Sequence, residues 1–254
     1  MNSSVVSARS RGILALASNT DTVDYVSIAT QTLALAGRQL GIEHRVIELA
    51  APLGWKNSRK DVDTNTMVSW NNHSRWSVYQ HSPWDETIVI DADYLVMTDS
   101  LNLLFASQAD YLLCSNNIMQ DNELPQCGLP DTWGTVLFFR KTEKSQCFFE
   151  LLQRIERNYH YYRAMFSVRD RNYRNDYAMA MADLIINAQQ THAGTRMPWS
   201  IATIEHEVTD IDANGDWIVV RGLDRADIFP RRDLHVMSKS WLQGPGLARL
   251  IGVA

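Results

Sequence analysis

The first fifty residues carry the pattern that most limits the fold, because strand, helix and strand signals follow one another directly. An apolar run at 12–17 is followed by turn-forming residues at 18–21, which is typical of a buried strand ending in a polar loop. Apolar residues recur at near-helical spacing over 26–40, and Gly41 ends that pattern as a helix C-cap does. A second strand is predicted at 45–49. Such a βαβ unit implies a parallel sheet with a ligand site at the carboxyl ends of its strands.

The rest of the chain continues the alternation of strands and helices. Residues 52–68 are polar and are expected to form a surface loop, and Asn214-Gly215 is a hairpin turn signal. Further elements are predicted as helices at 69–81, 147–162 and 176–187 and as strands at 87–90, 111–114 and 136–139. We therefore expect one α/β domain over residues 1–254, with a mixed, mainly parallel sheet flanked by helices.

Composition narrows the function classes without choosing one. The 254 residues are 45% hydrophobic and 21% charged, as in an ordinary globular protein. A net charge of -5 argues against a protein that coats nucleic acid with a globally basic surface, although a local basic strip is compatible with it. The polar N-terminus lacks a signal-peptide core, no run reaches membrane-span length, and three cysteines form no disulfide pattern. We expect a soluble cytoplasmic protein without a membrane partner.

Asp91 and Asp93 are the strongest chemical signal in the sequence. They lie one residue apart, directly after the apolar, β-branched run at 87–90, which predicts a central strand. Carboxylates placed there need a cation or hydrogen bonds, and their oxygens suit Mg²⁺ or Mn²⁺ that also binds substrate phosphates. The alternative is that both acids only cap a turn after the strand.

The sequence Ile-Val-Ile-Asp-Ala-Asp-Tyr-Leu-Val at 88–96, continued by 101–105, resembles the DxD segment of glycogenin-like, family 8 glycosyltransferases. Residues 14–19 and the pair at 24–25 are similar to that family's first strand and nucleotide-binding loop. The resemblance implies a GT-A, Rossmann-like fold, a UDP-sugar donor, and a nucleotide-binding half at about 12–115 before an acceptor-side half at 116–254. The donor contacts that it implies come from Asn19, Asp24, Tyr25, Arg75, Asp91, Ala92 and Lys239.

Three later segments extend the resemblance in the same order along the chain. Residues 132–139 look like the family's strand facing the donor sugar, although its usual Asn-Ser-Gly is absent. Residues 174–178 are similar to a segment that presents a catalytic group, which implies Asp176. Residues 234–241 resemble a C-terminal motif, which implies His235 as the third metal ligand beside Asp91 and Asp93 and Lys239 on the diphosphate. Plainer interpretations are a core histidine, a helix-capping aspartate and a surface lysine.

The segment 158–174 interleaves aromatic residues with arginines in an otherwise acidic chain. Such a strip is able to stack bases and bind phosphates, or it forms an amphipathic helix with buried aromatics and paired arginines. The candidate acceptor contacts are Tyr162, Arg163, Arg171 and Arg174. The chain also looks like compact GT-A proteins of bacteriophages, some associated with sugar transfer to 5-hydroxymethylpyrimidines, and this implies DNA as the acceptor in the host cytoplasm.

Other functions remain open at this stage. The acceptor in a glycosyltransferase could instead be a glycan or a small molecule, and a GT-A fold can serve a non-catalytic nucleotide-binding protein. A nucleotidyltransferase is disfavoured, because residues 17–21 lack the Gly-rich loop and following basic residue that such enzymes usually carry. Inverting and retaining transfer are equally compatible with the sequence.

Overall fold

A computed structural model describes residues 9–50, 57–116, 128–190, 193–213 and 215–252. Within these ranges the main sheet has eight strands, β1 (Arg11–Ala17), β2 (Glu43–Glu48), β5 (Glu86–Ile90), β6 (Tyr94–Leu95), β7 (Tyr111–Asn116), β8 (Trp133–Arg140), β9 (Arg196–Ile204) and β13 (Leu234–Val236). Two smaller sheets are β3 (Ser58–Lys60) with β4 (Met67–Ser69), and β10 (Asp210–Asp212) with β11 (Trp217–Arg221) and β12 (Ala226–Pro230). The α-helices are α1 (Tyr25–Leu40), α2 (Val78–His81), α3 (Glu143–Arg157), α4 (Tyr159–Met165), α5 (Asn175–Ile186), α6 (Lys239–Gln243) and α7 (Pro245–Leu250). Short 3-10 helices are η1 (Arg75–Ser77), η2 (Ser100–Ala106) and η3 (Ala193–Thr195).

The main sheet runs in the order β2-β1-β5-β8-β7-β9-β13-β6. Strands β8 and β6 are antiparallel to the strands beside them, and every other neighbouring pair in this sheet is parallel. The parallel pairing of β1 with β2 across α1 confirms the predicted βαβ unit. The α/β class with a mixed, mainly parallel sheet flanked by helices is therefore confirmed.

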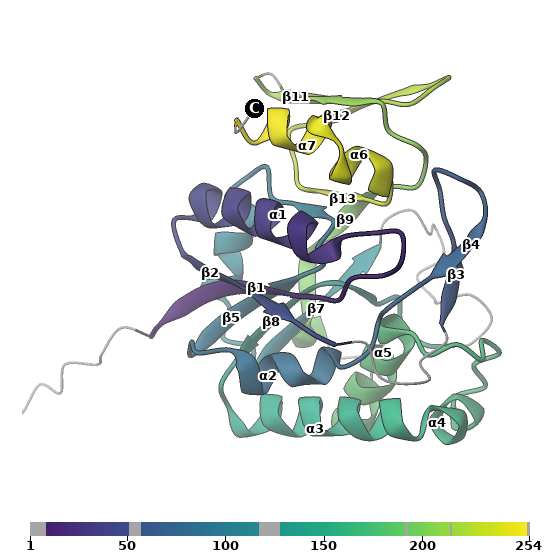
Figure 1. The fold of residues 1–254 in the computed structure, drawn as a ribbon. Coiled ribbons are helices and arrows are strands. Elements are labelled where there is room, and N and C mark those ends of the chain that lie inside the picture. Colours follow the sequence, from purple (N-terminus) through teal and green to yellow (C-terminus); the bar gives the residue numbers. More distant parts are fainter. Residues whose placement is uncertain (1–8, 51–56, 117–127, 191–192, 214, 253–254) are drawn as a thin grey trace, which may run out of the picture.

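Helices cover both faces of the sheet (Figure 1). The helices α1, α6 and α7 lie on one side, and α2, α3 and α5 lie on the other. Side chains of β1 alternate between the two layers, because successive residues of a strand point to opposite faces. Ile13 packs in the core with Ile28 and Leu33 of α1, whereas Leu14 packs in the opposite core with Phe148 of α3. Both faces are apolar, as expected for a strand inside a three-layer fold.

Local capping explains where α1 begins and ends. The Asp24 carboxylate accepts a hydrogen bond from the backbone N–H of Ser27 at 3.0 Å, which satisfies one of the free donors of the first turn. At the other end Gly41 adopts φ 67°, a left-handed conformation that favours glycine, and its N–H bonds the carbonyl of Gly37. The predicted helix and its glycine stop are confirmed.

The helix predicted at 69–81 is wrong over its first six residues. Residues 67–69 form β4, and helical structure begins only at Arg75 and ends at His81. The intervening side chains bond to distant backbone instead of supporting a helix: Asn71 donates to the carbonyl of Asn19, and Asn72 to that of Tyr173. The loop predicted at 52–68 is also partly wrong, since β3 and β4 form a hairpin there, while residues 51–56 lie outside the described ranges.

The helix predicted at 147–162 is split into α3 and α4. It begins earlier because Thr142 caps it by accepting from the backbone N–H of Ser145, and it breaks at Asn158, whose side-chain amide donates to the carbonyl of Arg154. The predicted helix at 176–187 and the hairpin before Trp217 are confirmed by α5 and by the antiparallel pair β10–β11. In the described part of the chain no helix combines the length and apolar character needed to cross a membrane.

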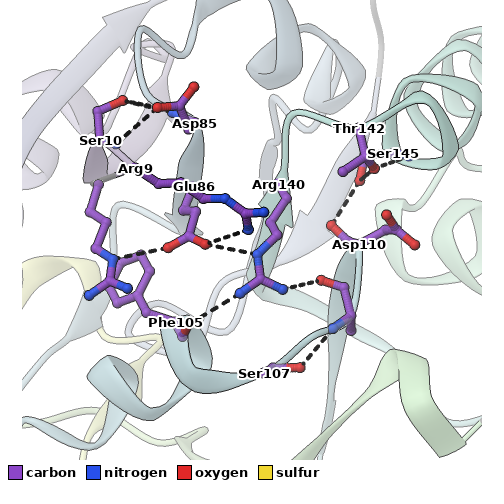
Figure 2. Close-up of polar contacts among 12 residues, drawn as sticks. Arg9, Ser10, Asp85, Glu86, Phe105, Ser107, Asp110, Arg140, Thr142 and Ser145 are labelled. Atoms are coloured by element: carbon purple, nitrogen blue, oxygen red, sulfur yellow. Dashed lines mark hydrogen bonds and ion pairs between the residues drawn. The ribbon is translucent and has the colours of Figure 1, made fainter. Parts of the chain in front are cut away.

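A buried charge cluster closes the N-terminal end of β5 (Figure 2). The Glu86 carboxylate accepts hydrogen bonds from Arg140 at 2.8 Å, Arg11 at 2.9 Å and Arg9 at 3.2 Å. Arg140 also donates to two backbone carbonyls, those of Phe105 and Ala109. These contacts fasten β5 to β1, β8 and the segment before β7.

Candidate active site

The turn that carries the two aspartates is fixed by three neighbouring elements. It follows β5, and the N–H of Asp91 donates to a carbonyl of β8 at 2.9 Å. The carbonyl of Ala92 accepts from the Thr32 hydroxyl of α1 at 2.9 Å, and that of Asp93 accepts from the N–H of Val236 in β13 at 2.9 Å. Backbone hydrogen bonds to β8 and β13 thus fix the position of this turn.

Asp91, Asp93 and His235 converge at this turn. Each of them offers one ligand atom, and these atoms all lie within 4.8 Å of one another. His235 Nε2 is 3.3 Å from Asp93 Oδ1, while Nδ1 is buried and has no hydrogen-bond partner among the described residues. Two carboxylates and an imidazole form a donor set that suits a divalent ion such as Mg²⁺ or Mn²⁺. The residues present therefore fit a divalent metal site.

Each of the two carboxylates also contacts a buried cation. Lys239 Nζ lies 2.5 Å from Asp93 Oδ2 and donates to two backbone carbonyls as well, and Arg75 Nη1 lies 2.7 Å from Asp91 Oδ1. Burial raises the pKa of Asp93, but the charges of Lys239 and His235 outweigh it and hold the pKa well below its usual value. The Asp93 carboxylate is therefore kept ionised, as a metal ligand must be.

Asp176 reaches this region from the first turn of α5. It does not cap its own helix; Oδ1 accepts from the N–H of Gly134 at 2.8 Å, and Oδ2 pairs with Arg174 at 2.9 Å. A Cβ on Gly134 would meet both Asn175 and the Asp176 carboxylate at 3.2 Å, so glycine permits this close approach. The contact ties α5 to β8 and orients the carboxylate toward the cleft.

A cleft of about 260 Å³ contains these groups. The carboxyl ends of β1 and β5 form its floor, as expected for a parallel sheet. The hairpin β3–β4 contributes Arg59 and Lys60, and the segment after it contributes Trp70, Asn71, Asn72 and His73. Tyr25 and Trp133 supply aromatic surface in the same cleft. Charged, amide and aromatic groups together suit a ligand that has anionic, polar and planar parts.

The predicted donor contacts divide into two groups. The residues of this set that line the cleft are Tyr25, Arg75, Asp91 and Ala92. Burial raises the pKa of Tyr25 to about 12, so its hydroxyl stays protonated and accepts from Arg59 Nη2 at 3.0 Å. The structure places Asn19 and Asp24 in supporting contacts with α1, where they accept from backbone N–H groups of Val26 and Ser27. Lys239 is buried against Asp93.

The predicted acceptor contacts are dispersed. Arg174 lines the cleft and pairs with Asp176. Arg163 instead donates to the carbonyls of Val168 and Arg169, closing the turn after α4. Tyr162 packs partly buried against the α3–α5 core, and Arg171 is exposed on the surface. The structure thus brings one of the four residues into the cleft.

Comparisons with known proteins give weak structural similarities. No family model matches the sequence, and no curated protein matches it. The apo-form glycosyltransferase GlyE of Streptococcus pneumoniae TIGR4 is 9% identical with a TM-score of 0.42, covering 75% of this chain and 45% of GlyE. An active-site mutant of LgtC is 14% identical with a TM-score of 0.48, covering 95% of this chain and 94% of LgtC. A glycosyltransferase involved in glycosylation of the major capsid of PBCV-1 is 11% identical, with a TM-score of 0.33 and coverage of 68% and 89%.

This chain spans less than half the length of GlyE, and similarities of this size do not assign a function. The functional argument therefore rests on the chemistry of the cleft.

Several cleft residues were not predicted from the sequence. Arg59 and Trp70 line the cleft and lie in or beside the β3–β4 hairpin, whereas Trp133 comes from the segment 132–139 that the resemblance placed beside the donor sugar. The available signal was the run Trp70-Asn71-Asn72-His73, which concentrates aromatic and amide groups. Interpreting that run as part of a helix hid it, although adjacent asparagines favour turns and backbone contacts over helix interiors.

Proposed function

We propose that this protein is a metal-dependent glycosyltransferase of the GT-A type that uses a nucleotide-sugar donor. The observation that carries this proposal is the convergence of Asp91, Asp93 and His235 within 4.8 Å, inside a cleft at the carboxyl end of the central strand. Buried lysine and arginine side chains accompany these ligands. Hard metal ligands beside fixed cations are what a phosphate-bearing leaving group requires.

Asp91, Asp93 and His235 would hold Mn²⁺ or Mg²⁺, which when bound neutralises charge on the departing nucleotide diphosphate. The protein's own contribution is to keep both carboxylates ionised and oriented. Arg75 fixes Asp91 through its 2.7 Å contact, and Lys239 fixes Asp93 while its other donors bond the backbone carbonyls of β13 and the residue after it.

Asp176 is the proposed base for the acceptor hydroxyl. Its carboxylate lines the cleft and is oriented by Gly134 and Arg174. A fixed carboxylate within reach of the reacting hydroxyl meets the geometric requirement for general base catalysis. Tyr25 and the polar residues of the loop after β1 are proposed to receive the nucleoside, with UDP as the expected nucleotide.

Thermal stability with UDP, GDP and CDP, each with and without Mn²⁺, tests the donor proposal. A ligand that binds only the folded state raises the melting temperature, so UDP with Mn²⁺ is expected to give the largest shift. An Asp93→Asn variant serves as the control that lacks one metal ligand. If none of the three nucleotides shifts the wild-type transition with metal, a nucleotide-sugar enzyme is the wrong assignment.

For the acceptor we propose DNA that carries 5-hydroxymethylpyrimidines. The supporting feature is Arg174, which lines the cleft and is preceded along the chain by the exposed residues Arg171 and Tyr161. Exposed cationic and aromatic groups of this kind can bind the phosphates and stack the bases of an extruded nucleotide. Sugar transfer to hydroxymethylated oligonucleotides but not to unmodified ones is expected. Transfer only to glycans or small molecules would redirect the acceptor assignment, and donor binding without any transfer would indicate a binding protein.

A further inference from the structure

Two cations that line the cleft, the exposed Lys60 and the half-buried Arg59, have no salt bridge to a described carboxylate, whereas the other charged groups are paired. Arg75 pairs with Asp91, Arg174 with Asp176, and Lys239 with Asp93. Arg59 lines the same cleft, yet no carboxylate of the described residues lies within salt-bridge distance of it. The cleft therefore holds a guanidinium without a salt bridge to a described carboxylate, although its charge is near enough to Asp93 to lower the pKa of that group.

The geometry of Arg59 shows that this cation is partly desolvated. Its Nε is buried and has no hydrogen-bond partner among the described residues, although a buried N–H is costly to leave unpaired. Nη2 donates to the Tyr25 hydroxyl at 3.0 Å, and the guanidinium carbon lies 5.9 Å from the centroid of the Trp70 ring. These contacts fix the side chain in place, and Nη1 makes no hydrogen bond to a described residue.

We propose that Arg59 binds a phosphate group of the nucleotide donor directly from the β3–β4 hairpin. This inference rests on the proposed function. A guanidinium presents several N–H donors in one plane and is always charged, which matches phosphate oxygens better than any neutral donor. The anion would pair with a guanidinium that has no salt bridge to a described carboxylate. Binding through Arg59 does not need the metal, so part of the nucleotide affinity persists when the metal is removed.

Isothermal titration calorimetry with UDP, uridine and inorganic pyrophosphate, each with Mn²⁺ and in EDTA, tests this role. Arg59→Gln is expected to weaken UDP and pyrophosphate binding by about tenfold to a hundredfold in both conditions, because a charge-assisted hydrogen bond is lost. Uridine has no phosphate, so its affinity is expected to stay unchanged. Arg59→Lys keeps the charge without the planar donor array and should recover part of the loss.

The matched control is Arg45→Gln, which removes an exposed arginine from β2, away from the cleft. It should bind all three probes as the wild type does. Unchanged uridine affinity in Arg59→Gln also shows that the hairpin and Tyr25 are still in place, which separates lost phosphate binding from local misfolding. A drop in uridine affinity equal to that for UDP would assign Arg59 a structural role and overturn the inference.

The remaining outcomes separate this inference from the proposed function. If wild type binds UDP and Arg59→Gln binds it equally well, the phosphate role of Arg59 is wrong while the donor proposal stands. If wild type binds pyrophosphate through Arg59 but does not bind UDP, the anion site stands and the proposed donor is wrong. If wild type binds neither probe, both proposals are wrong.

Discussion

Strand β5 carries acidic residues at both ends, and the two ends differ in how completely their charge is satisfied. At the N-terminal end the Glu86 side chain is 2% exposed and accepts from three arginines. Beyond the C-terminal end the Asp91 side chain is 36% exposed and pairs with Arg75, in a cleft that also holds Asp93. We call the charge cluster around Glu86 the closed end of β5, and the group around Asp91 and Asp93 its open end.

The difference lies in the groups left without partners. Around Glu86, Arg140 uses its remaining donors on the carbonyls of Phe105 and Ala109, so the cluster is complete within the protein. Around Asp93, His235 Nδ1 and Arg59 Nε are buried without partners among the described residues. Unpaired buried polar atoms are rare in stable structures, and they gather where a ligand completes the set. This difference fits a role in folding for the closed end and agrees with the ligand binding that we propose for the open end.

Substitution of Glu86 should break the closed end and give the largest loss of stability. Glu86→Gln leaves the buried Arg140 without its counter-ion, and removing one partner of a buried pair costs about 3 to 5 kcal/mol. The free energy of unfolding from urea denaturation measures this. Transfer activity per folded molecule should remain near that of the wild type. If Glu86→Gln has the same free energy of unfolding as the wild type, the cluster does not stabilise the fold.

The opposite pattern is expected at the open end. Asp91→Asn should lower transfer activity about a hundredfold, since it weakens a metal ligand, and each tenfold corresponds to about 1.4 kcal/mol of barrier. Its unfolding free energy should fall by less than that of Glu86→Gln, because the Asp91 side chain is 36% exposed and the buried Arg75 keeps its hydrogen bond to the Gly134 carbonyl. Kinetics and urea denaturation on the same preparation compare the two effects. Loss of stability with full activity would reverse the assignment of the two ends.

The sequence allowed the core of the fold to be predicted where signals are local. Apolar periodicity and Gly41 define α1, and the β-branched run before Asp91 defines β5, because these patterns need no distant partner. Asp91 and Asp93 were identified for the same reason, since they directly follow a strand that is buried along its whole length.

Elements that depend on distant partners could not be derived from local pattern. Lys239 lies 146 positions from Asp93, and only a resemblance to a known family suggested that the two regions meet. Strand β13 has three residues, too few for a periodic signal, yet it brings His235 to the site. The role of Arg59 was missed because a short polar hairpin resembles a loop, and its single arginine becomes informative only after its neighbours are known.

The stability that the Glu86 carboxylate contributes should depend on pH in the acid range. Burial raises the pKa of Glu86, but hydrogen bonds from the three arginines outweigh it, so its pKa lies below the usual 4.5. A depressed folded-state pKa contributes stability that is fully present above 4.5 and is lost as pH falls through the folded-state pKa. The stability gap between wild type and Glu86→Gln should therefore narrow as pH falls below 4.5 in urea titrations. A gap that is independent of pH would mean that the ionised carboxylate is not what stabilises this end.

The three arginines around Glu86 should not contribute equally, and the exposed ones provide the smallest expected effects. Arg9 and Arg11 are 59% and 50% exposed, so water and salt screen their ion pairs, and each pair is worth at most about 1 kcal/mol. Arg11 also lies over the Phe105 ring at 4.9 Å, which adds a weak cation–π contact that Arg9 lacks among the contacts described. Urea denaturation should therefore rank Arg11→Gln slightly below wild type and Arg9→Gln nearly equal to it, with both differences shrinking in high salt. If either variant lost as much unfolding free energy as Glu86→Gln, the stability of the closed end would depend on all three arginines. The buried pair of Glu86 with Arg140 would then not be its main source.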